Sequence, residues 1–132
     1  MEKPSDIERT SGMEKRNGTG FTRLANAFKC SLHGIGYAYK HESAFRQELA
    51  LCIFLVPVAF FVSESPIELV LLIGSLLLVL IVECMNSAIE AAIDRISTSI
   101  HPLSKQAKDL GSAAVFFSML VVVLSWSAIL LF

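Results

Sequence analysis

A long uncharged run that ends in a stripe of polar residues is the feature that most constrains the fold of this chain. Residues 69–82 carry no charge, and Glu83, Asn86, Glu90 and Asp94 follow. At about 100° per residue, this spacing places all four side chains on one face of a helix. An ionisable group inside a bilayer costs about 3 kcal/mol and usually faces a functional cavity or a partner. The stripe therefore predicts a site at one end of a membrane-spanning helix, where a divalent cation or a proton would relieve repulsion among the carboxylates.

Composition favours a small membrane protein. Of the 132 residues, 54% are hydrophobic, which is high for a soluble domain. The three cysteines show no CxxC spacing and indicate neither a disulfide framework nor a metal site.

The basic residues are unevenly placed along the chain. Eight of the eleven Lys and Arg residues lie at or before Arg46, and the others are Arg95, Lys105 and Lys108. Because cytoplasmic loops of membrane proteins are rich in Lys and Arg, the N-terminus and the 95–108 loop are predicted to be cytoplasmic and the C-terminus outside.

We expect an all-α membrane protein with an N-terminal amphipathic surface helix and three transmembrane helices. Phe21, Leu24, Phe28 and Leu32 recur at spacings of three or four among polar residues, which is typical of a helix lying on a membrane surface. The expected parts are a polar tail over 1–19 and a membrane domain over 20–132, with the surface helix at about 21–40, spans at about 44–62, 67–94 and 113–132, and a polar loop over 97–109.

This topology brings polar side chains from three segments to the cytoplasmic interface: Glu42, Arg46 and Glu48, then Glu83, Glu90 and Asp94, then Lys108 and Asp109. Three spans can hardly enclose so many ionisable groups, so self-association is expected. Two carboxylates that hold Mg²⁺, together with a lysine, suit a nucleoside triphosphate. Glu83 lies deepest in the membrane, where desolvation suits it to act as a general base. The phosphate-loop pattern GxxxxGK(S/T) and the kinase patterns HRD and DFG are absent, and the chain is too short for a conventional soluble kinase.

Four sequence stretches and one tryptophan carry a family resemblance. They are GFTR (20–23), ESAFRQE (42–48), VECMNSAIEAAIDRI (82–96), HPLSKQAKDLGSAAV (101–115) and Trp126. The combination E-x2-N-S-A-I-E-x3-D with a later A-K-D-x-G-S-A-A is highly specific. Over about residues 18–132 the chain resembles the small prokaryotic integral-membrane diacylglycerol kinases.

The resemblance implies a lipid kinase that transfers the γ-phosphate of Mg-ATP to diacylglycerol and yields phosphatidate. It also implies a homotrimer with active sites between protomers, in the inner membrane of a bacterium, which we expect to be Gram-negative. By similarity, Glu83 is the catalytic base, Glu42 and Glu90 bind the metal, and Asn86 and Asp94 support the site. The implied ATP contacts are Arg23, Cys30, Glu42, Glu90, His101, Lys108 and Asp109. The implied lipid contacts are Arg23, Ser31, Ala44, Phe45, Arg46, Gln47, Glu48, Glu83, Ser112 and Trp126.

The chain departs from the family pattern in the surface helix. Cys30 stands where an aromatic residue is common, and Asn26 stands where a lysine can occur. Several alternatives stay open at this point. A related branch of the family phosphorylates undecaprenol, and a proton-coupled exporter also uses a membrane glutamate, although such exporters usually have four spans and an acid near mid-membrane. Glu83 alone is also consistent with a buried acid that pairs with Arg46 or with a neighbouring chain and has no catalytic role. Glu48 is consistent with a structural acid that pairs with a polar group on another helix.

Overall fold

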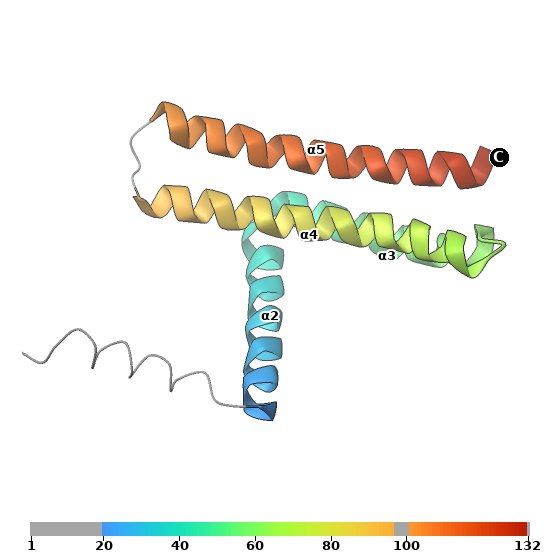
Figure 1. Cartoon of the computed structure of the whole chain (residues 1–132), viewed down its shortest axis with the longest axis horizontal. Helices are drawn as coiled ribbons and strands as arrows, with labels where there is room; N and C mark the ends of the chain where they lie inside the picture. Colours follow the sequence, from blue (N-terminus) through green and yellow to red (C-terminus); the bar gives the residue numbers. More distant parts are fainter. Residues whose placement is uncertain (1–19, 97–100, 132) are drawn as a thin grey trace, which may run out of the picture. The chain divides into compact units, whose positions relative to one another are not determined.

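Helices make up the regular structure of the residues that the structure describes. The computed structural model describes residues 20–96 and 101–131, so the predicted tail over 1–19 and the end of the last span at Phe132 lie outside the described residues. In chain order the helices are α2 (Phe21–His41), α3 (Ser43–Val62), α4 (Pro66–Ile96) and α5 (Pro102–Leu131) (Figure 1). The described residues contain no strand. Three of these helices, α3, α4 and α5, are long and apolar enough to cross a membrane, which confirms the all-α class and the three predicted spans.

The chain divides into two compact units after Tyr37. In the first unit, α2 is helical as predicted, and its large apolar side chains are exposed, with Phe21 85% and Leu24 67% accessible. The amphipathic character of α2 and its location on a membrane surface stay predictions.

In the second unit, α4 packs against both α3 and α5, and the three helices run antiparallel in sequence order (Figure 1). A buried cluster joins them and consists of Cys52, Ala59, Leu72, Leu76 and Trp126. Because lipid tails are as apolar as these side chains, close packing rather than exclusion of water holds such helices together.

The turn between α3 and α4 is fixed by a capping box. The Ser65 hydroxyl donates to Glu68 Oε1 over 3.0 Å and accepts the Glu68 N–H over 3.3 Å, and Glu68 Oε2 accepts the Glu64 N–H over 2.7 Å. Pro66 occupies the first helical position, where its missing N–H costs nothing. The helix therefore starts at a defined residue.

The break between α2 and α3 is a single residue. Glu42 has an extended backbone, with φ −103° and ψ 114°, before α3 begins at Ser43. Arg46 Nη1 donates to the carbonyl of Tyr39 over 3.1 Å and to that of Lys40 over 3.4 Å. This guanidinium satisfies carbonyl groups that the end of α2 leaves without helical partners.

The start of α5 corrects the prediction of a polar loop over 97–109. Although 97–100 lies outside the described residues, α5 begins at Pro102, well before the predicted start of the span. His101 Nδ1 accepts the Leu103 N–H over 3.2 Å and so caps the first turn. Lys105 and Asp109 form an ion pair of 2.6 Å at the i, i+4 spacing that supports a helix. Lys105, Gln106 and Lys108 are good helix formers, and polarity alone does not indicate a loop.

The packing of this core is tested by comparing substitutions at Leu72 and Leu71. Leu72 is fully buried, whereas its neighbour Leu71 is 52% exposed. We expect Leu72→Ala to lower the free energy of unfolding by about 2 kcal/mol or more, because it leaves a cavity between helices. The matched change Leu71→Ala should cost about 0.5 kcal/mol or less. Reversible denaturation in mixed micelles, followed by the fluorescence of the single tryptophan, measures both; equal losses would contradict this core.

Candidate active site

A polar pocket lies where α3, α4 and α5 meet, and it has a volume of about 310 Å³. It brings together six residues that the sequence predicts for the site: Glu42, Ala44, Glu83, Asn86, Glu90 and Ser112. Ser43 and Val115 also line it. Both belong to stretches that carry the family resemblance, but sequence reasoning singled out neither, because neither side chain is ionisable. The helical period puts the α4 residues on one face, and packing adds the α3 and α5 residues.

The acids in this pocket differ in burial. Glu83 is 5% exposed and follows directly after the uncharged run of α4, whereas Glu42 and Glu90 are half-buried. Glu83 interacts electrostatically with both of these carboxylates. Like charges in a partly desolvated site repel, so this arrangement favours a proton or a cation between them.

Oxygen donors of the polar pocket fit a magnesium ion. Glu42 and Glu90 supply hard carboxylate oxygens, which Mg²⁺ prefers. Among residues 20–96 and 101–131, no group of three or more His, Cys, Asp or Glu side chains stands close enough to hold a metal. Magnesium in phosphoryl-transfer sites takes one or two carboxylates and completes its shell with phosphate and water, so two carboxylates satisfy its requirement.

Asn86 connects two helices at the pocket wall. Its Nδ2 donates to Glu90 Oε1 over 3.2 Å, one turn further along α4. Its Oδ1 is buried and accepts no hydrogen bond within the described part of the chain. Gly111 of α5 is buried beside this amide. The amide therefore lies between α4 and α5 and orients the Glu90 carboxylate.

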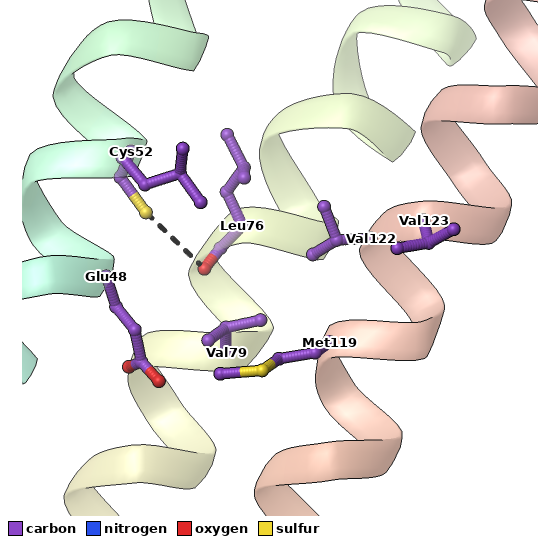
Figure 2. A pocket seen from close by; sticks show the side chains of 8 residues that line it. Glu48, Cys52, Leu76, Val79, Met119, Val122 and Val123 are labelled. Carbon is purple, nitrogen blue, oxygen red and sulfur yellow. Dashed lines mark hydrogen bonds between the residues drawn. The ribbon is translucent and has the colours of Figure 1, made fainter. Parts of the chain in front are cut away.

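An apolar pocket of about 210 Å³ lies in the same unit (Figure 2). Glu48 lines it together with Leu51, Cys52, Leu76, Val79, Met119, Val122 and Val123. Glu48 is 7% exposed, and neither of its carboxylate oxygens has a hydrogen-bond partner in the described structure. It interacts electrostatically with Glu83, so the two buried acids lie close to one another.

The predicted phosphate-binding residues pair with neighbours. Lys108 Nζ forms an ion pair of 2.6 Å with Asp94 Oδ1, which joins α5 to the outer end of α4. Asp109 pairs with Lys105, and His101 caps α5. None of these side chains lines the polar pocket.

The remaining predicted lipid contacts are dispersed. Phe45 is buried, Gln47 is exposed, and Arg46 binds the carbonyl groups at the end of α2. Trp126 belongs to the buried cluster of the second unit, and its Nε1 has no hydrogen-bond partner in the described structure. Arg23, Cys30 and Ser31 belong to the first unit, and their roles stay predictions.

This chain is similar in sequence to known proteins of one family. A family model described as prokaryotic diacylglycerol kinase matches residues 29–130. A diacylglycerol kinase of Haemophilus influenzae is 48% identical over 114 residues, which cover 86% of this chain and 97% of that protein. The diacylglycerol kinase of Pseudomonas aeruginosa is 50% identical over 113 residues, covering 86% of this chain and 92% of that protein. That of Escherichia coli is 46% identical over 114 residues, covering 86% and 93%.

The exposed pair between Lys108 and Asp94 should contribute little to stability, because water screens it. We expect Asp94→Asn to leave the midpoint of denaturation in mixed micelles unchanged. Asp109→Asn, which removes the other exposed pair on α5, is the matched control for stability. A large drop of the midpoint in Asp94→Asn alone would mean that this pair holds α5 against α4.

Proposed function

Because the chain belongs to the prokaryotic diacylglycerol kinase family, we propose that it is an ATP-dependent lipid kinase that phosphorylates diacylglycerol. The reaction transfers the γ-phosphoryl group to the free hydroxyl of the lipid, and the products are phosphatidate and ADP. Three long apolar helices and the family agree with a bacterial membrane protein.

The observation that carries the proposal is the pairing of a polar pocket with an apolar one. The polar pocket offers carboxylates for a metal-bound triphosphate, and the apolar pocket offers a surface for a hydrocarbon chain. Glu83 and Glu48, the buried acids of the two pockets, lie close together. A lipid kinase needs this combination, because one substrate arrives from water and the other from the bilayer.

Glu83 is the proposed general base. It accepts the proton of the lipid hydroxyl while the hydroxyl oxygen forms a bond to the γ-phosphorus and the bond from this phosphorus to the β–γ bridging oxygen breaks. The pocket wall desolvates Glu83, and a less hydrated carboxylate is a better proton acceptor. Glu48 is proposed to bind the polar part of the lipid at the edge of the apolar pocket.

Glu42 and Glu90 are the residues that would hold Mg²⁺, which neutralises the charge of the phosphates when bound. Lys108 would contact phosphate after leaving Asp94, and Asp109 would support it. Arg23, Cys30 and His101 are the proposed further contacts to the nucleotide. The remaining lipid contacts are proposed to be Arg23, Ser31, Ala44, Phe45, Arg46, Gln47, Ser112 and Trp126.

The proposed assembly is a homotrimer in the inner membrane of a Gram-negative bacterium, with active sites shared between protomers. The exposed apolar stripe of α2 supports a position on the membrane surface. The excess of basic residues before Arg46 supports a cytoplasmic N-terminus and an outside C-terminus.

The role of Glu83 is tested by Glu83→Gln, which keeps the shape of the side chain but cannot accept the proton. We expect kcat for phosphatidate formation in mixed micelles to fall by at least about 100-fold. Glu64→Gln, in the turn between α3 and α4, is the matched control and should retain wild-type turnover. Undecaprenol is offered in parallel: transfer to undecaprenol alone would change the acceptor, and transfer to neither lipid by the folded wild type would overturn the kinase proposal.

The metal role is tested by Glu42→Gln and Glu90→Gln. Each change removes one anionic oxygen donor, so we expect the Mg²⁺ concentration for half-maximal activity to rise by about 10-fold. The KM for diacylglycerol should change much less. A rise in the lipid KM with an unaltered Mg²⁺ requirement would place these carboxylates at the acceptor instead.

A further inference from the structure

Gly111 is a buried residue to which the proposed chemistry assigns no role. It lies on α5, one residue before Ser112 of the polar pocket. A Cβ atom built on Gly111 would overlap Asn86 Oδ1 and lie 3.3 Å from Asn86 Cγ. The same atom would be 3.9 Å from Asn86 Cα, which is an ordinary contact. The space that a side chain at 111 would need is thus occupied by the Asn86 amide and not by the α4 backbone.

The amide orientation follows from what the Glu90 carboxylate accepts. A carboxylate offers only acceptor oxygens, so the amide nitrogen of Asn86 must face Glu90 Oε1, as the 3.2 Å contact shows. The amide oxygen then points to Gly111, where it is buried and has no hydrogen-bond donor among the residues that the structure describes. This unpaired oxygen is energetically unfavourable, but the same orientation of the amide lets its nitrogen hold one oxygen of Glu90.

We propose that Gly111 is a positioning residue for metal binding: its missing side chain admits the Asn86 amide between α4 and α5, and the amide holds the Glu90 carboxylate toward the polar pocket. The inference rests on the proposed function, because it assigns Glu90 to the metal. With Oε1 fixed by Asn86, the second oxygen of Glu90 has a defined direction. Partners that orient a ligand in this way commonly change metal affinity by about 10- to 100-fold when they are removed.

Gly111→Ala tests the inference, with binding of the Mn²⁺ complex of a non-hydrolysable ATP analogue as the readout. Binding is measured by electron paramagnetic resonance on purified protein in micelles. We expect Gly111→Ala to weaken binding by about 10-fold, because the new methyl group displaces the amide from Glu90. Gly74→Ala on α4 is the matched control: a Cβ at Gly74 meets no atom of the described residues within 4 Å, so binding should be unchanged.

A double-mutant cycle separates this role from simple helix packing. Asn86→Ala removes the amide, so adding Gly111→Ala to it should weaken binding no further. Additive losses would overturn the inference, because they would mean that Gly111 acts without Asn86. If Gly111→Ala alone does not fold, the inference requires that the double variant with Asn86→Ala folds. A double variant that also fails to fold would overturn the inference.

The same measurements distinguish the inference from the proposed function. Wild-type protein that binds the Mn²⁺ nucleotide complex and phosphorylates diacylglycerol, with Gly111→Ala binding equally well, would overturn the inference and leave the function intact. Wild-type protein that binds no such complex would overturn both.

Discussion

The burial of the Glu83 carboxylate on α4 is the constraint on which the second unit depends. Glu83 is 5% exposed although it follows directly on an uncharged membrane segment. Such a group is tolerated only where the surrounding protein supplies a polar cavity, a partner or a cation. α3 and α5 supply the cavity by packing against α4, and Glu42 and Ser112 complete its wall. The packing of the helices and the polar lining of the site thus both serve to accommodate the buried Glu83 carboxylate.

Much of this arrangement could be predicted from the sequence, because hydrophobic length and helical period are local properties. The uncharged run 69–82 predicts a span, and α4 (Pro66–Ile96) contains it. The spacing of Glu83, Asn86 and Glu90 predicts a shared face, and all three line one pocket. Topology predicts that Glu42 reaches the same interface, because the first span begins on the side of the membrane where the second span ends.

The contacts made between helices could not be predicted in this way. The loop predicted up to Asp109 is helical from Pro102, because a cap at His101 and good helix formers outweigh the polar composition. The pairing of Lys108 with Asp94 and the fit of Asn86 against Gly111 depend on the register of α5 on α4. Register between helices leaves no periodic signal in a single sequence, so these details appear only in three dimensions.

The depth of Glu83 follows from the two substrates that the proposed reaction must join. A lipid hydroxyl stays near the boundary between hydrocarbon and headgroups, while a metal-bound triphosphate stays in water. A base placed deeper in α4 would be out of reach of the nucleotide, and one placed beyond Glu90 would meet the lipid hydroxyl only if the lipid left the bilayer. Glu83 instead lines the polar pocket and lies close to Glu48 of the apolar pocket. Its position at the end of the apolar segment therefore suits the proposed base, which must reach one substrate in water and the other in the bilayer.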